Sequence, residues 1–180
     1  MTGHSCSQVM ALVLCAKNRP LTKIALLSDY FVILSVLSLI GMYISSDFSR
    51  LEIDLGGCLE NYKYFRSMLK DSTRLLVLVK ANAYGHGAVQ FASVMEKAGA
   101  NYLAVAYPVE GMELRQAGIK SPIMVLTAGT DSFGGIVSYG LEPGIPNMYA
   151  LRILCDVLEE RGVTDYPIHI KLDTGMHRLG

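Results

Sequence analysis

The sequence predicts an α/β fold with a parallel sheet, and two patterns between residues 49 and 180 predict it. Short runs rich in Leu, Val and Ile, typical of buried strands, recur at spacings of roughly 20 to 25 residues. Stretches with apolar residues at helical spacing lie between these runs. Strands that alternate with helices over short connections form a parallel sheet, and about five such units are expected from residue 75 onward.

Each element follows from a local pattern. Residues 51–55 alternate apolar and charged side chains, which predicts a strand with one solvated face. Asp131 and Asn147 are expected to cap helices, and Pro143 weakens the strand that it interrupts. Further strands are expected at residues 75–81, 102–106, 123–126, 141–145 and 168–172. Helices are expected at residues 59–69, 88–98, 109–117, 131–139 and 147–161.

The first part of the chain has a different character. Residues 24–44 are almost entirely apolar, but Asp29 interrupts them, and the charge-free part is shorter than the ~20 residues of a membrane span. Three interpretations stay open: an extension foreign to the native domain, such as a misplaced start; a weak membrane anchor; or a docked apolar helix. We expect an N-terminal extension over residues 1–48 and an α/β domain over residues 49–180.

Composition excludes some classes of function. The 16 basic residues balance the 16 acidic ones and form no basic stripe, so nucleic acid is not expected as the main partner. The cysteines are widely spaced, which predicts reduced thiols in a cytoplasmic protein rather than disulfides or a metal site. No metal is expected. The cysteines are Cys6, Cys15, Cys58 and Cys155.

The first candidate site is residues 77–87 (VLVKANAYGHG), in which Lys80 comes at the carboxyl end of a buried strand. Folds of this class place ligands at that end of the sheet. A lysine whose stem is held among apolar residues loses hydration, which favours the neutral amine needed for a Schiff base with a carbonyl cofactor. The glycines at 85 and 87 match no dinucleotide or phosphate-loop motif.

The second candidate site is residues 171–180 (KLDTGMHRLG), also at the carboxyl end of a strand. The planar fork of Arg178 matches a carboxylate or a phosphate. Asp173 is expected to turn the loop, and Gly175 permits unusual backbone angles. Taken alone, this segment reads as a surface loop with a solvated arginine.

Together the two segments resemble the alanine racemase family. Residues 79–88 are similar to the lysine motif that binds pyridoxal phosphate in that family, and residues 173–180 are similar to its second signature. The resemblance extends over about residues 50–180, including residues 101–106, but not over the apolar N-terminal extension. It implies a (β/α)8, or TIM-type, barrel domain, here partial, with pyridoxal 5'-phosphate as cofactor. It also implies interconversion of L-alanine and D-alanine, which supplies D-alanine for peptidoglycan.

The resemblance also assigns roles to residues. Lys80 would hold the cofactor and act as the base for the D enantiomer, and the hydroxyl of Tyr84 would bind the cofactor phosphate. Arg178 would orient the substrate carboxylate or the cofactor ring oxygen. Lys171 corresponds to a lysine that is often carbamylated in the family and braces that arginine. His86 and His177 are expected to be structural.

The family completes its site with a tyrosine from a C-terminal β domain, which reaches across the interface of a homodimer. That domain is absent from the sequence, so we expect an N-terminal fragment with little or no racemase activity alone. The alternatives are a non-catalytic barrel that binds pyridoxal phosphate, and a membrane-tethered pseudoenzyme fragment that rests on residues 24–44. Loss of α-deuterium from alanine separates the first alternative from a racemase. A racemase for other small amino acids also stays open.

Overall fold

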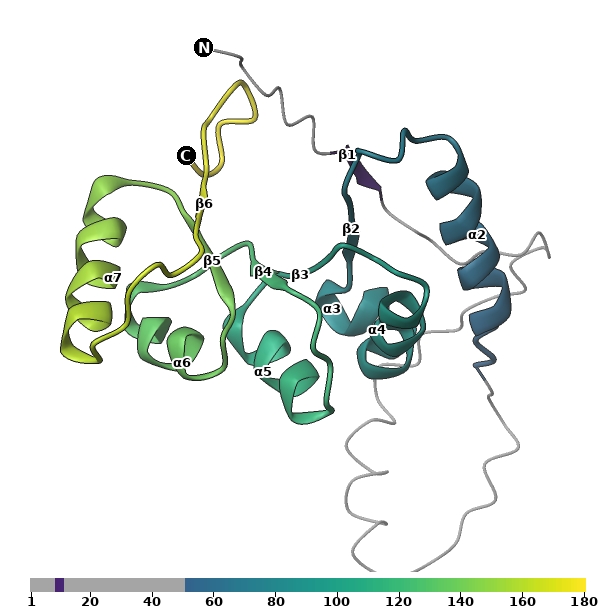
Figure 1. Cartoon of the computed structure of the whole chain (residues 1–180), viewed down its shortest axis with the longest axis horizontal. Coiled ribbons are helices and arrows are strands. Elements are labelled where there is room, and N and C mark those ends of the chain that lie inside the picture. Colours follow the sequence, from purple (N-terminus) through teal and green to yellow (C-terminus); the bar gives the residue numbers. More distant parts are fainter. Residues whose placement is uncertain (1–8, 12–50) are drawn as a thin grey trace, which may run out of the picture. The chain divides into compact units, whose positions relative to one another are not determined.

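The computed structural model describes residues 9–11 and 51–180 (Figure 1). The chain divides into two units, one of Met1–Cys15 with Leu55–Gly180 and one of Ala16–Asp54. All described helices and strands belong to the first unit. The apolar segment 24–44 lies outside the described residues, so the limits of the expected extension stay predictions. No helix in the described part of the chain has the length and hydrophobicity needed to span a bilayer.

The sheet is parallel throughout, and its strand order follows the chain order. Figure 1 shows the strands succeeding one another along a curve, with the helices that follow them on its outer side. This is a curled half-barrel, which confirms the predicted partial (β/α)8 fold and the five strands from residue 75 onward. The strands are β1 (Val9–Ala11), β2 (Leu75–Leu78), β3 (Tyr102–Val105), β4 (Ile123–Val125), β5 (Glu142–Ile145) and β6 (His169–Ile170).

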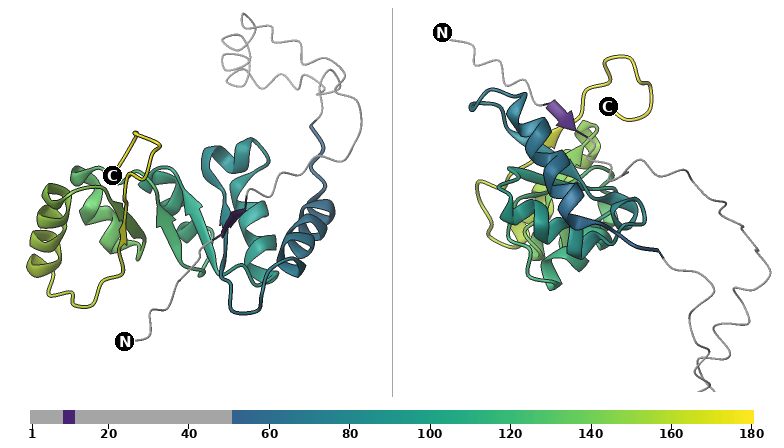
Figure 2. Two further views of the ribbon diagram at one scale, coloured as in Figure 1. Left: turned by 90° about the horizontal axis from the view of Figure 1, so that it is seen from above. Right: turned by 90° about the vertical axis from the view of Figure 1, so that its right-hand side faces the viewer.

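Apart from α3 (Lys80–Tyr84), which was not predicted, the helices lie close to the predicted positions. Helices α2 and α7 are at opposite ends of the sheet (Figure 2). Asn147 caps α7 as predicted, because its side-chain oxygen accepts the N–H of Ala150 at 2.9 Å. Asp131 does not act as a cap; it lies inside a 3₁₀ turn, Thr130–Ser132, that precedes α6. The helices are α2 (Leu55–Ser67), α3 (Lys80–Tyr84), α4 (Ala88–Lys97), α5 (Pro108–Gln116), α6 (Phe133–Ser138) and α7 (Met148–Glu160).

The strand predicted at residues 51–55 is wrong. Residues 51–54 form neither helix nor strand, and α2 begins at Leu55. Alternation of apolar and charged residues indicates only a local preference for a strand, and a strand also needs an unpaired strand beside it. In this structure both edges of β2 are paired, one with β3 and the other with β1, in which Val9 lies opposite Leu75.

The core lies between the sheet and its helices. Successive strand residues point to opposite faces, and Leu75, Val77 and Val79 are fully buried in one cluster with Phe91 and Met95 of α4. Burial of each such side chain contributes about 1.5–3 kcal/mol. This apolar layer anchors the strands, so the residues just beyond their carboxyl ends are held in place.

Arg115 of α5 joins two of the loops that lead into strands. Its guanidinium donates to the carbonyl oxygens of Ile119 at 2.8 Å and Ser121 at 2.7 Å, before β4. It also donates to those of Tyr139 at 3.2 Å and Gly140 at 3.1 Å, before β5. One side chain therefore satisfies acceptors at the amino ends of two neighbouring strands.

We expect Arg115→Ala to lower the free energy of unfolding by about 3 kcal/mol, because charged hydrogen bonds to four carbonyl groups are lost. Arg115→Lys should be more stable than Arg115→Ala but less stable than the unaltered chain, since an ammonium group cannot span both loops. Urea denaturation measures both values. Arg152→Ala, at an exposed position on α7, is the control and should change the stability by less than about 0.5 kcal/mol. Equal losses at the two arginines would contradict this account.

Candidate active site

A cavity of about 520 Å³ at the carboxyl edge of the sheet brings three of the predicted site residues together. Lys80 comes from the end of β2, and Lys171 and Arg178 come from the segment after β6. Their roles stay predictions, but their placement in one cavity is a property of the fold. The remaining lining residues are Ala106, Tyr107, Leu126, Thr127 and Leu179.

Lys80 follows directly on the ladder between β2 and β3. The N–H of Val79 donates to the carbonyl oxygen of Ala104 at 2.8 Å, and Lys80 then begins α3. The predicted strand is therefore shorter than expected, and the lysine lies at the start of a turn. Its side chain is half-buried, with the amine 6.0 Å from the centre of the Tyr84 ring.

The turn after Lys80 is left-handed. The φ angles of Ala81, Asn82, Ala83 and Tyr84 are 52°, 53°, 51° and 56°. Residues with a Cβ pay roughly 1–2 kcal/mol each for this conformation, and such residues usually occur singly. A run of them next to the candidate lysine is therefore strained backbone that the surrounding structure must hold.

Hydrogen bonds hold this turn on its far side. The side-chain oxygen of Asn82 accepts the N–H of Ala88 at 2.7 Å, at the start of α4. The carbonyl oxygen of Asn82 also accepts the N–H of Gly87 at 3.0 Å. A ring nitrogen of His86 lies 2.7 Å from the carbonyl oxygen of Ala83, consistent with the structural role expected for this histidine. Asn82 therefore ties the lysine turn to α4.

Lys171 reaches across β5 to the cavity. Its amine donates to the carbonyl oxygen of Leu126 at 3.1 Å, just beyond β4. The stem passes over Gly144, where an added Cβ would lie 3.2 Å from the Lys171 Cδ. Burial, and to a lesser extent the charge of Arg178, lower the pKa of Lys171. The neutral amine is therefore easier to form here than on an exposed lysine.

The loop that carries Arg178 turns around Asp173, as predicted. One carboxylate oxygen of Asp173 accepts the N–H of His177 at 2.9 Å and that of Gly175 at 3.0 Å. These backbone donors lower the pKa of Asp173. Arg178 itself is exposed, so its guanidinium is accessible to a ligand in the cavity.

Tyr84 is not among the cavity-lining residues. Its side chain is 39% exposed, and its ring faces the amine of Lys80 from the end of the left-handed turn. The proposed contact between its hydroxyl and a cofactor phosphate stays a prediction.

Sequence reasoning missed a polar layer below the cavity. Glu142 of β5 is buried and pairs with His169 of β6 at 2.7 Å. The His169 ring meets the Tyr102 ring edge to face, with centroids 5.7 Å apart, and Arg74 lies 4.4 Å above Tyr102. Lys171 follows β6 directly and continues its pairing with β5, so its side chain lies on the same face as that of His169. The charged Glu142 within the strand expected at residues 141–145 was the available signal.

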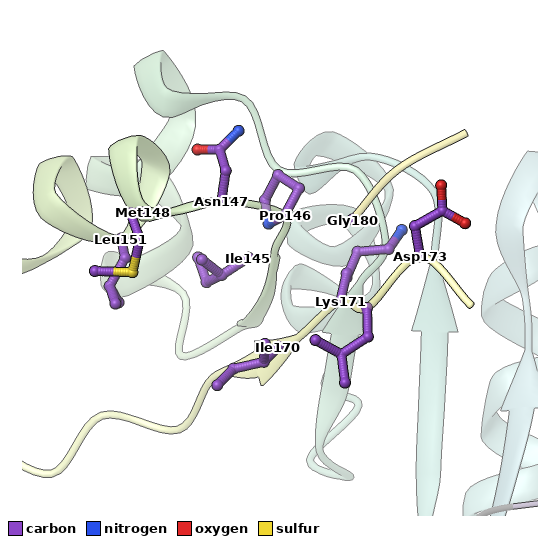
Figure 3. A pocket seen from close by; sticks show the side chains of 10 residues that line it. Ile145, Pro146, Asn147, Met148, Leu151, Ile170, Lys171, Asp173 and Gly180 are labelled. Carbon is purple, nitrogen blue, oxygen red and sulfur yellow. The ribbon is translucent and has the colours of Figure 1, made fainter. Parts of the chain in front are cut away.

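A second, smaller cavity of about 310 Å³ lies beside the first (Figure 3). Figure 3 shows Met148 and Leu151 of α7 on one side and Lys171 with Asp173 on the other. Its walls are mostly apolar, and Lys80 does not line it. The reactive side chains therefore converge in the larger cavity, which is the candidate active site.

The fold and this site define a partial (β/α)8 barrel domain that presents a lysine amine at the carboxyl edge of its sheet. The chain belongs to the alanine racemase family: the family model described as "Alanine racemase, N-terminal domain" matches residues 53–180. The predicted resemblance is confirmed, and with it the assignment to a family of isomerases.

Individual proteins that are similar to this chain support its membership of the family. An alanine racemase from Synechocystis sp. is 40% identical over 132 residues, which covers 72% of this chain and 35% of that protein. The structure of alanine racemase from Clostridium difficile 630 in complex with cycloserine matches with a TM-score of 0.65 at 32% identity, covering 68% of this chain and 34% of that chain. The structure of alanine racemase from Bartonella henselae with covalently bound pyridoxal phosphate matches with a TM-score of 0.65 at 25% identity. The match covers 71% of this chain and 36% of that chain. The chain spans about a third of the length of the curated relatives it matches.

We expect Ala81→Gly to stabilise the chain by up to about 1 kcal/mol, because glycine adopts φ of 52° without a steric penalty. Ala117→Gly is the matched control, since Ala117 is exposed and has φ of −77°. Because Ala117 is the C-cap of α5 and not a mid-helix residue, that substitution should lower the free energy of unfolding by less than about 1 kcal/mol. Thermal or urea denaturation measures the two changes, and the same sign at both positions would refute the strained turn.

Proposed function

We propose that this chain supplies the cofactor-lysine part of a pyridoxal-phosphate-dependent racemase that interconverts L-alanine and D-alanine. The observation that carries the proposal is the convergence of Lys80, Lys171 and Arg178 in one cavity at the carboxyl edge of the sheet. Membership of the alanine racemase family supports the choice of reaction.

The residues present suit the cofactor. A primary amine on a half-buried lysine can bind an aldehyde covalently, and the guanidinium of Arg178 lines the same cavity for an anionic group. A volume of about 520 Å³ lies within the usual range for a small-molecule site. The covalently bound pyridoxal phosphate of the Bartonella henselae relative supports this fit.

When bound, pyridoxal phosphate supplies the electron sink for removal of an α-proton. In this proposal Lys80 holds the cofactor, and its freed amine moves a proton at the α-carbon of the D enantiomer. The guanidinium of Arg178 binds the alanine carboxylate, or the cofactor ring oxygen, and orients the α-carbon toward Lys80. The hydroxyl of Tyr84 would donate a hydrogen bond to the cofactor phosphate.

We also propose that Lys171 supports Arg178 as a carbamate. The neutral amine would form an N–C bond to carbon dioxide and release a proton, so a side chain that is ordinarily a cation would become an anionic carbamate and pair with the guanidinium of Arg178. The lowered pKa of Lys171 supports this, because only the neutral amine reacts.

The whole protein is expected to contribute the rest of the reaction. A base on the opposite face of the substrate, a homodimer and a cytoplasmic location belong to this proposal, as does supply of D-alanine for peptidoglycan. A test of these features needs a protein as long as the relatives, of which this chain spans about a third.

The first test is covalent capture at Lys80. The chain is mixed with pyridoxal phosphate and treated with borohydride, which makes a lysine–cofactor bond permanent. Peptide mass analysis should find the added mass on Lys80 in preference to exposed lysines such as Lys120, because Lys80 lies in the cavity.

Lys80→Arg keeps the charge and should abolish capture at this position, whereas Lys120→Arg should leave it unchanged. Equal labelling of Lys80 and Lys120 in the unaltered chain would count against the proposal, because it indicates no specific site.

The second test concerns Lys171. With ¹³C-labelled bicarbonate, carbamate on Lys171 should form at lower pH than on exposed lysines, since burial and Arg178 lower the pKa of its amine. Arg178→Ala should reduce the carbamate, because it both raises the pKa of Lys171 and removes the cation that pairs with the product. Carbon NMR measures the signal, and Lys171→Ala assigns it. A carbamate that is unaffected by Arg178→Ala would disprove the pairing.

A further inference from the structure

We propose that Glu110 is a positioning residue of this site: its carboxylate holds the left-handed turn that directs Lys80 into the cavity. The inference rests on the proposed function of Lys80. Glu110 lies in the first turn of α5 and is not among the cavity-lining residues, so it acts through the backbone rather than on a ligand.

The geometry joins two strand ends through one side chain. One carboxylate oxygen of Glu110 accepts the N–H of Ala81 at 2.6 Å. The other accepts the N–H groups of Ala106 at 2.7 Å and Tyr107 at 2.9 Å. Ala81 follows Lys80 directly, and Ala106 and Tyr107 line the cavity. Glu110 therefore ties the residue after Lys80 to the part of the cavity wall that follows the neighbouring strand β3.

The contact with Ala81 goes beyond ordinary helix capping. A glutamate in the first turn of a helix commonly accepts the N–H of the residue just before that helix, here Tyr107. That bond gives a partner to the backbone N–H at the start of α5 and involves no other element. The other oxygen is directed to a residue 29 positions earlier in the chain, on a different βα unit.

Ala81 is the first residue of the left-handed turn, so the bond acts where the strain begins. Its N–H belongs to the peptide group that joins Lys80 to Ala81. An acceptor that holds this N–H fixes the plane of the peptide group and, with it, the direction in which the Lys80 side chain leaves the backbone. The short distance to a carboxylate oxygen is typical of a charge-assisted hydrogen bond.

A carboxylate is the side chain that suits three converging donors, because it only accepts hydrogen bonds. Glu110→Gln turns one oxygen into an NH₂ group, which opposes at least one of the N–H groups. Glu110→Asp keeps both oxygens but shortens the reach by one methylene. Glu113→Gln is a matched control: it removes the same charge from an exposed position on the same helix.

The first measurement is hydrogen exchange of single amides in the full chain by NMR. Glu110→Gln should speed exchange of the Ala81 amide about tenfold or more, because a bond to a charged group is lost. The Leu103 amide, which donates to Pro122 at 2.9 Å inside the sheet, should change much less. Glu113→Gln should leave both amides as in the unaltered chain.

The second measurement is the rate at which pyridoxal phosphate is captured on Lys80 with borohydride. Glu110→Gln should slow capture about tenfold, since misplacement of a reacting group costs rate steeply. Glu110→Asp should recover part of the rate, and Glu113→Gln should have no effect.

The outcomes separate this inference from the proposed function. If Lys80 of the unaltered chain is not captured, the proposed function fails, while faster Ala81 exchange in Glu110→Gln still supports the hold on the turn. If Ala81 exchange is unchanged, the inference is wrong. It is also wrong if Leu103 exchange rises by the same factor, or if Lys80 is captured at the unaltered rate despite faster Ala81 exchange.

Discussion

The parallel hydrogen-bond ladder is the constraint on which the site depends. Because all strands run the same way, residues that follow them emerge at one edge of the sheet. Lys171 illustrates this: its N–H continues the ladder by donating to Ile145 at 2.9 Å, and its side chain then crosses to the end of β4. Lys80 leaves the ladder at the equivalent point after β2. The apolar layer beneath the helices holds these strand ends in register.

The site combines a firmly packed support with a strained segment. Below the cavity, a carboxylate oxygen of the buried Glu142 lies 2.7 Å from a ring nitrogen of His169, so this polar group has a hydrogen-bond partner across β5 and β6. Above it, the backbone after Lys80 is left-handed and is held by polar groups on either side, Glu110 on one and Asn82 on the other. Strain of this kind persists only where its surroundings determine it.

Sequence patterns predicted most of the fold because each βα unit is encoded locally. Apolar periodicity placed the strands from β2 onward and the helices other than α3, and two motifs located Lys80 and Arg178. Residues 51–55 were assigned wrongly because pairing depends on which edge is free, not on alternation alone. The contacts of Glu110 with Ala81 and of Glu142 with His169 were missed because both join residues of different units. Such contacts depend on tertiary arrangement.

The chain-ordered sheet also bears on how the site assembles. From β2 onward each strand pairs with its neighbours in the sequence, so these units can be added one after another with little loss of chain entropy at each step. The cavity, however, spans from Lys80 to Arg178, the two ends of this series. Its walls meet only when the last unit has docked, so a ligand that needs both walls recognises the completely folded series rather than any partly folded precursor.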